Sequence, residues 1–223
     1  KITFLNIYIY PTFMRCFNII SFIFLLLSCQ CHNSYDLKKK HHTSSGFKNI
    51  YKTDKKGLLD LIKWRWERFF KEIKSADDYN FSLQKPDIKK FMNEKRPVFI
   101  WLGHASILGK INGVTFITDP HFSDRASPVS WAGPKRVHAS PLKIEELPKI
   151  DLVILSHNHY DALDLETVRS FKKYKATKEA KYIVPVGLKK WFHERGVTKV
   201  KEMDWWETFE YKETQIVSVP AQH

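Results

Sequence analysis

Residues 151–161, DLVILSHNHYD, decide the fold, because an apolar run is followed at once by three residue types that bind metals. The run 152–155 predicts a buried strand, and α/β proteins usually place their sites at the C-terminal ends of such strands. Side chains alternate along an extended chain, so His157, His159 and Asp161 would point to one side. Imidazole nitrogen and carboxylate oxygen are suitable zinc ligands. The stretch therefore predicts a metal site rather than a turn with three chance polar residues.

Short β-rich runs and helical patterns flank this stretch on both sides. Strands are predicted at residues 98–102, 114–118, 182–186, 197–202, 208–212 and 215–219, and helices at 164–174 and 188–195. We expect strands 98–102, 114–118 and 152–155 to be buried on both faces. Strands mixed with helices predict an α/β or α+β sandwich.

The composition is that of a folded protein with an excess of positive charge. Hydrophobic residues make up 43% of the 223 residues and aromatic residues 14%, which argues against disorder. The formal net charge of +13 suits an anionic partner, although a lysine-rich solvated surface is the plainer interpretation. The lysines are scattered, and the chain has neither a glycine–aromatic RNA-binding pattern nor a paired-cysteine finger. We therefore expect no nucleic-acid partner.

Cysteine occurs only near the N-terminus, at Cys16, Cys29 and Cys31. From His32 onward the chain has none, so the predicted folded body has no internal disulfide and no thiolate ligand. Any metal in that body must be held by histidine nitrogen and carboxylate oxygen.

Residues 14–28 are typical of a lipoprotein signal peptide. The apolar run 17–27 is too short to span a bilayer comfortably but fits the hydrophobic region of a signal peptide that starts at Met14. It ends in LLSC at Cys29, which resembles a bacterial lipobox, where cleavage before the cysteine exposes its thiol for lipid attachment. Residues 1–13 would then be mis-assigned upstream sequence.

The alternative for this segment is a plain membrane anchor over residues 2–27, interrupted by Arg15. Both interpretations place the protein at a membrane, and we expect a lipid-anchored protein of the bacterial cell envelope. Residues 29–56 are polar and basic, which is typical of a flexible tether. Within it, the adjacent His41 and His42 could bind metal weakly, but we expect them to be solvated.

The segment 57–74 predicts an amphipathic helix, because leucine, isoleucine and aromatic residues recur among charges at helical spacing. It belongs to a predicted N-terminal helical extension, residues 57–96. Packing on the main domain is the default for such a helix. Docking on lipid is the alternative, since tryptophan and lysine are good interfacial residues.

The motif His157-x-His159-x-Asp161 resembles the signature of the metallo-β-lactamase superfamily. The likeness extends through WLGHAS at 101–106, TDPHFS at 118–123, RASP at 125–128, WAGPKR at 131–136 and PAQH at 220–223. Together these motifs resemble the branch that contains N-acylphosphatidylethanolamine-hydrolysing phospholipase D and its bacterial relatives, over about residues 95–223. The resemblance implies an αββα sandwich of which residues 97–223 are the N-terminal half. We accordingly expect a truncated domain that is poorly soluble and inactive alone.

The resemblance also implies roles for individual residues. His157, His159 and His223 match the ligands of a first metal, and Asp161 matches a ligand of a second. Asp161 and His159 are also the predicted catalytic residues.

Two further residues are implied to support the ligands. Asp119 matches an aspartate that buttresses the histidine loop and can fix a histidine tautomer. His104 is expected to be structural or to support a ligand rather than to bind metal.

The chain departs from the family pattern at Ala162, where a second histidine usually follows the aspartate. Alanine cannot bind a metal, so we expect one tightly bound zinc and a second that is weak or absent. Asp164 could compensate, but capping the following helix is its expected role.

The implied mechanism is metal-assisted hydrolysis, in which the ion activates water and polarises the oxygen under attack. We expect a phosphodiesterase acting on an anionic small molecule or a phospholipid, with Lys135 and Arg136 either holding the anionic group or serving as ordinary surface charge. A lactonase or other ester hydrolase is a second hypothesis, and a degenerate, non-catalytic metal-binding lipoprotein is a third. The sequence predicts neither the exact substrate nor the oligomeric state.

Overall fold

The computed structural model describes residues 35–44, 46–51, 57–71 and 83–221, all within the unit Cys31–His223. The predicted signal peptide and Cys29 lie outside the described residues. Within the described residues, none of the helices combines the length and the apolar character that a membrane span requires.

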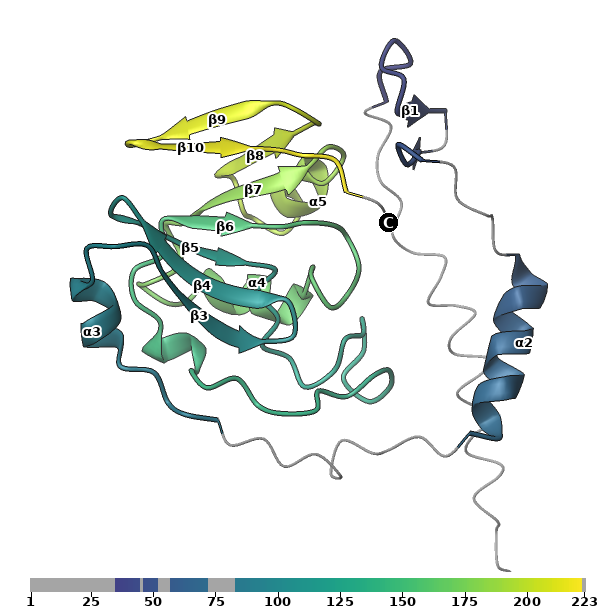
Figure 1. The fold of residues 1–223 in the computed structure, drawn as a ribbon, viewed down its shortest axis with the longest axis horizontal. Coiled ribbons are helices and arrows are strands. Elements are labelled where there is room, and N and C mark those ends of the chain that lie inside the picture. Colours follow the sequence, from purple (N-terminus) through teal and green to yellow (C-terminus); the bar gives the residue numbers. More distant parts are fainter. Residues whose placement is uncertain (1–34, 45, 52–56, 72–82, 222–223) are drawn as a thin grey trace, which may run out of the picture. The chain divides into compact units, whose positions relative to one another are not determined.

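The centre of the fold is a mixed six-stranded sheet with the strand order β3-β4-β5-β6-β7-β8 (Figure 1). Its strands are β3 (Val98–Gly103), β4 (Ser106–Ile111), β5 (Val114–Thr118), β6 (Leu152–Ile154), β7 (Lys181–Pro185) and β8 (Val200–Met203). Strands β3, β4 and β5 pair antiparallel, and β5 to β8 pair parallel. The sheet therefore changes from hairpin connections to crossover connections at β5.

Strand β4 was not predicted, although the sequence contains a signal for it. Asn112 and Gly113 connect β4 to β5 with φ angles of 48° and 73°. Two adjacent positive φ angles form the tight turn that suits the twist of a hairpin, and Asn-Gly is the preferred dipeptide there.

Two helices cover one face of the sheet. The helices α4 (Leu165–Phe171) and α5 (Lys189–His193) connect β6 to β7 and β7 to β8. Phe171 is 1% exposed and Phe192 0%, and both pack into the larger core cluster with residues of the sheet. Burying one such ring contributes about 1.5–3 kcal/mol, so these two side chains are main anchors of the helical layer.

The other face is covered by a two-stranded hairpin of β9 (Thr208–Tyr211) and β10 (Thr214–Val217). Phe209, Tyr211 and Ile216 of this hairpin pack on a second cluster that contains Leu152 and Ile183. Helices, a mixed sheet and a second sheet confirm the predicted α/β sandwich, with most element bounds within one to three residues of expectation.

One prediction about the sheet is wrong. Strand β3 is not buried on both faces, because it forms the edge of the sheet: Phe99 is 57% exposed and Trp101 49%. Strands β5 and β6 do have buried or half-buried residues throughout. The apolar composition that the three strands share cannot distinguish an edge strand from a central one.

The N-terminal elements differ from the expected tether in one respect. Strands β1 (His42–Thr43) and β2 (Gly46–Phe47) form a small hairpin inside the range predicted to be flexible. The helix α2 (Leu58–Phe69) lies where predicted, but none of its residues is buried, so packing and lipid docking both stay predictions. The short helices α3 (Ile88–Asn93) and η2 (Ile144–Glu146) complete the described elements.

Candidate metal centre

The loop that follows β6 brings the predicted ligands together. His157, His159 and Asp161 each offer one ligand atom, and these atoms all lie within 4.8 Å of one another. The rings of the two histidines meet edge to face, with centroids 4.8 Å apart. The fourth predicted ligand, His223, lies outside the described residues.

A hydrogen-bond relay from Asp119 through Ser156 orients the first histidine. The Ser156 hydroxyl donates to Asp119 Oδ2 at 2.8 Å, and the Ser156 backbone N–H donates to Oδ1 at 2.8 Å. The Ser156 Oγ also lies 2.7 Å from His157 Nδ1. Because the hydroxyl proton points to Asp119, the oxygen can only accept from Nδ1–H. In the neutral ring, Nε2 therefore has the lone pair, which is the form that binds a metal.

Asp119 reaches this position because the chain turns sharply after β5. Its φ angle is 38°, a left-handed value that is uncommon outside glycine but several-fold enriched in aspartate and asparagine. Its backbone N–H donates to the Ile154 carbonyl at 2.9 Å, and the residue is 7% exposed. The strained turn thus brings the carboxylate of one strand end beside the histidine loop of the next. Sequence reasoning assigned the buttressing to Asp119 but missed Ser156, whose place directly before His157 was the available signal.

Asp161 is held by His104. The His104 Nε2 lies 2.7 Å from Asp161 Oδ2, whereas Asp161 Oδ1 lies 4.0 Å from His157 Nε2. Burial raises the pKa of Asp161, but the His104 hydrogen bond and nearby positive charge outweigh it and hold the pKa below its usual range. The carboxylate is therefore ionised at neutral pH, with one oxygen held by His104 and the other facing His157.

These residues fit a divalent transition metal. Two imidazoles and one carboxylate converge, and the relay leaves the His157 Nε2 lone pair on the side of the other donors. Such a nitrogen and oxygen donor set suits zinc, iron, manganese and related ions, and it excludes none of them by geometry.

Comparisons with known proteins identify the family to which this region belongs. Residues 115–223 match the model of the beta-lactamase superfamily domain. These residues belong to the metallo-β-lactamase superfamily. The predicted family and fold class are thereby confirmed.

Several curated proteins are similar to this chain. An N-acyl-phosphatidylethanolamine-hydrolyzing phospholipase D of Caenorhabditis elegans is 41% identical over 142 residues, which cover 60% of this chain and 39% of that protein. A mitochondrial protein of the same description from Saccharomyces cerevisiae is 38% identical over 58% of this chain and 28% of its own length. A metal-dependent hydrolase of Methanopyrus kandleri is 32% identical over 55% of this chain and 46% of its own length. The chain thus spans less than half the length of each of these relatives.

Among solved structures, the diiron β-hydroxylase CmlA of Streptomyces venezuelae is similar, with 25% identity and a TM-score of 0.41 over 57% of this chain and 24% of that one.

Near the departure from the family pattern at Ala162, Asp164 has the capping role that the sequence predicts. Ala162 is 1% exposed and offers no donor atom. Asp164 caps α4, as predicted, by accepting from the Glu166 backbone N–H at 3.1 Å. Its carboxylate also accepts from Ser123 and Thr167, at 2.8 and 2.6 Å from their hydroxyls. With these contacts Asp164 joins the start of α4 to the loop at residues 122–123.

His121 is a buried residue of this region that sequence reasoning gave no role. It is 3% exposed, its Nε2 lies 3.3 Å from the Arg125 carbonyl, and its Nδ1 has no hydrogen-bond partner among the described residues. Burial lowers its pKa. The motif TDPHFS contained this histidine, but nothing in the motif indicated burial.

Arg136 has a structural place beside the site. Its guanidinium donates to the backbone carbonyls of His121 at 2.7 Å, His138 at 3.1 Å and Leu102 at 3.4 Å. Burial lowers its pKa. Lys135 is exposed. A role for either residue in substrate binding stays a prediction.

Proposed function

We propose that this protein is a zinc-dependent phosphodiesterase that hydrolyses an N-acylphosphatidylethanolamine-like phospholipid. The single observation behind the metal-dependent part is the Asp119–Ser156–His157 relay, which presents an imidazole lone pair beside Asp161 and His159. The phospholipid part is supported by the descriptions of two relatives and by the net charge of +13.

The protein's own residues would have separate tasks in this reaction. His157 and His159 would hold the ion together with His223, and Asp161 would contribute an oxygen. Asp119 and Ser156 would keep His157 in the right tautomer, while His104 would keep Asp161 ionised and oriented. When bound, the ion would supply Lewis acidity toward the phosphodiester and its attacking water.

The test is turnover by the full-length protein, reconstituted with zinc, on vesicles that contain N-acylphosphatidylethanolamine, with a lactone panel as the second substrate class. We expect release of phosphatidic acid, loss of it in His157→Ala, and retention of it in His193→Ala, an exposed histidine on α5. Lactone opening without phospholipid hydrolysis would replace the proposed substrate. Bound zinc without turnover on either class would favour a degenerate metal-binding protein.

We also propose that the protein is a membrane-anchored lipoprotein of the bacterial cell envelope, because LLSC at Cys29 matches the lipobox pattern. Detergent phase partition of the wild type and of Cys29→Ser tests this. Processed wild type in the detergent phase, with an unprocessed serine variant, is the expected result. Equal membrane binding with no cleavage in either would make the segment a plain anchor.

A further inference from the structure

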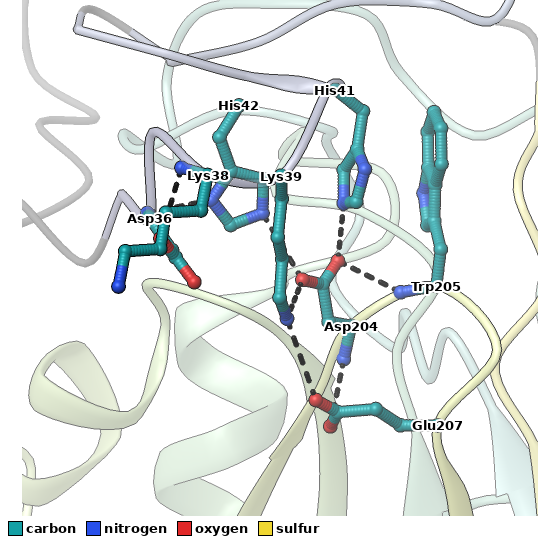
Figure 2. A network of polar contacts seen from close by, with 8 residues as sticks. All are labelled: Asp36, Lys38, Lys39, His41, His42, Asp204, Trp205 and Glu207. Atoms are coloured by element: carbon teal, nitrogen blue, oxygen red, sulfur yellow. Dashed lines mark hydrogen bonds and ion pairs between the residues drawn. The ribbon is translucent and has the colours of Figure 1, made fainter.

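A second group of metal-ligating side chains lies outside the metal centre. His41, His42 and Asp204 each offer one ligand atom within 4.8 Å of the others. Asp204 directly follows β8, whereas the histidines belong to residues 36–44 and 46–47, which we call the clasp. Figure 2 shows Lys39, His41 and His42 of the clasp reaching the Asp204 carboxylate.

The Asp204 carboxylate has no lone pair left for a cation. Its side chain is 4% exposed. Oδ1 accepts from His41 Nε2 at 2.7 Å and from the Trp205 backbone N–H at 2.8 Å. Oδ2 accepts from Lys39 Nζ at 2.5 Å and from His42 Nε2 at 3.1 Å. A carboxylate offers about four lone-pair positions, and four donors occupy them.

The tautomer of His42 also indicates that this group does not bind a cation. The Asp36 backbone N–H donates to His42 Nδ1 at 2.8 Å. A backbone amide can only donate, so Nδ1 accepts and Nε2 has the proton. The nitrogen that faces Asp204 is therefore a hydrogen-bond donor and not a metal ligand. This group is a hydrogen-bonded fastening between the clasp and the β8–β9 turn.

Aromatic contacts hold the clasp in a single arrangement. The His41 ring stacks on Trp205 with centroids 4.1 Å apart and an interplanar angle of 13°. His42 meets Phe47 edge to face at 4.8 Å, and the Lys48 backbone N–H donates to the His41 carbonyl at 2.9 Å. The His42 side chain is 2% exposed. Such packing around a buried charge gives the fastening a defined geometry.

The fastened turn is also the base of the β9–β10 hairpin. The Trp206 backbone N–H donates to the Ser218 carbonyl at 2.7 Å, and the Ser218 N–H donates to the Glu207 carbonyl at 3.0 Å. Ser218 directly follows β10, and the predicted ligand His223 comes five residues later. At its opposite end the hairpin has a separate fastening, Lys212 Nζ to Asp151 Oδ1 at 3.1 Å.

We propose that the clasp is a positioning element of the metal centre. By gripping Asp204, it fixes the base of the hairpin from which the chain continues to His223, so that docking of the N-terminal segment and metal affinity are coupled. This inference rests on the proposed function, in which His223 is a metal ligand. Lys39, His41, His42 and Asp204 act through the hairpin and not on the substrate.

The experiment compares zinc affinity and clasp docking in the full-length protein. Zinc affinity is measured by competition with a chelator, and docking by the rate of tryptic cleavage after residues 38–40. In the double variant His41→Ala/His42→Ala we expect faster cleavage and a loss of zinc affinity of roughly 2- to 30-fold, the usual range for coupling through packed elements. Lys39→Met should change both in the same direction by less, because only one donor is lost; its cleavage is compared after residues 38 and 40 alone, since the substitution removes the site after residue 39.

Two matched variants separate positioning from general stability. His41→Gln/His42→Gln keeps an amide donor toward each Asp204 oxygen and should restore most of the zinc affinity. Lys212→Met removes the fastening at the other end of the same hairpin, and we expect zinc affinity within about twofold of wild type.

Each of the other possible outcomes overturns a particular part of the proposal. Faster cleavage with unchanged zinc affinity overturns the positioning role while leaving the proposed function intact. Wild type that binds no zinc overturns the proposed function and the coupling with it. Zinc that persists in His157→Ala/His159→Ala but is lost with the clasp histidines would make the clasp itself a metal site. Equal losses in Lys212→Met and the clasp variants would show that hairpin stability alone is measured.

Discussion

Among the described residues, two groups each contain two histidines and one aspartate, and the groups are alike in composition and in the distances between their ligand atoms. In the first, Ser156 accepts from His157 Nδ1, so that Nε2 has the lone pair. In the second, the Asp36 N–H donates to His42 Nδ1, so that Nε2 has the proton. The hydrogen-bond partner of the histidine Nδ1 therefore decides whether Nε2 can bind a metal or donates a hydrogen bond that fastens two segments together.

The carboxylates of Asp161 and Asp204 differ in the number of hydrogen bonds that they accept. Both Asp161 and Asp204 have pKa values below the usual range, because donated hydrogen bonds and positive charge outweigh the effect of burial. Yet Asp204 has four donors on its two oxygens, whereas His104 donates to only one oxygen of Asp161. A low pKa alone thus does not identify a metal ligand.

Removing a predicted metal ligand should have the largest effect on zinc affinity. In the full-length protein, His157→Ala should lower zinc affinity by more than about 100-fold, because loss of a ligand exceeds the ~10–100-fold effect of losing its outer partner. His42→Ala, the matched change in the other group, should keep the same zinc stoichiometry. Metal content after dialysis measures both. Equal losses of stoichiometry in the two variants would remove the distinction between the groups.

The relay should have the next largest effect. Asp119→Ala removes the acceptor that fixes the Ser156 hydroxyl, which frees His157 to change tautomer or orientation. We expect zinc affinity to fall ~10–100-fold, with Asp119→Asn intermediate because it keeps one acceptor oxygen. Chelator competition gives the values. Wild-type affinity in Asp119→Ala would mean that the His157 tautomer is set by something else.

The hydrogen bonds that the clasp donates to Asp204 should make the free energy of unfolding fall at acidic pH. Asp204→Asn should lower the free energy of unfolding by about 2–3 kcal/mol at pH 7, since a buried charge-assisted network loses its acceptor. The pKa of Asp204 is held below its ordinary value of 3.8, so this stability is present above pH 3.8 and is lost as the pH falls toward the lower folded value.

Urea unfolding of wild type and variant at pH 7, 5 and 3 would measure this effect. Lys39, His41, His42 and Glu207 are the titratable side chains around the carboxylate, and they are the same in both proteins. We therefore expect the difference in the free energy of unfolding between wild type and Asp204→Asn to narrow at pH 3. A difference that stays constant from pH 7 to pH 3 would contradict an ionised Asp204.

The smallest change concerns the second metal. In the full-length protein we expect one zinc per molecule after dialysis, and Ala162→His should raise the content toward two, because it adds an imidazole beside Asp161. Ala162 is 1% exposed, so Ala162→Phe serves as a control for bulk without a donor. Two tightly held metals in wild type would show that the site is completed by another residue.

The strands, helices and ligand loop could be predicted because their signals are local. Alternation and apolar runs located β5, β6 and β7, and the HNHYD spacing placed three candidate ligands on one loop. Edge exposure of Phe99 could not be predicted, since it depends on which strands pair. The docking of His41 and His42 was missed because a polar, basic segment has the composition of a tether whether or not a distant carboxylate receives it.

The sequence by itself determined the residue types at the metal loop, their spacing, and the absence of a donor at Ala162. Only the tertiary structure decided which nitrogen of His157 and of His42 has the proton. The physical reason is that these hydrogen bonds exist only in the folded chain: Asp119, 37 residues away, orients the Ser156 hydroxyl, and Asp204, 162 residues away, receives the proton that the Asp36 N–H leaves on His42 Nε2. A hydrogen bond to the far ring nitrogen, or to a buried carboxylate, exists only after the chain has closed those loops, so identical residue types become a ligand set in one place and a fastening in the other.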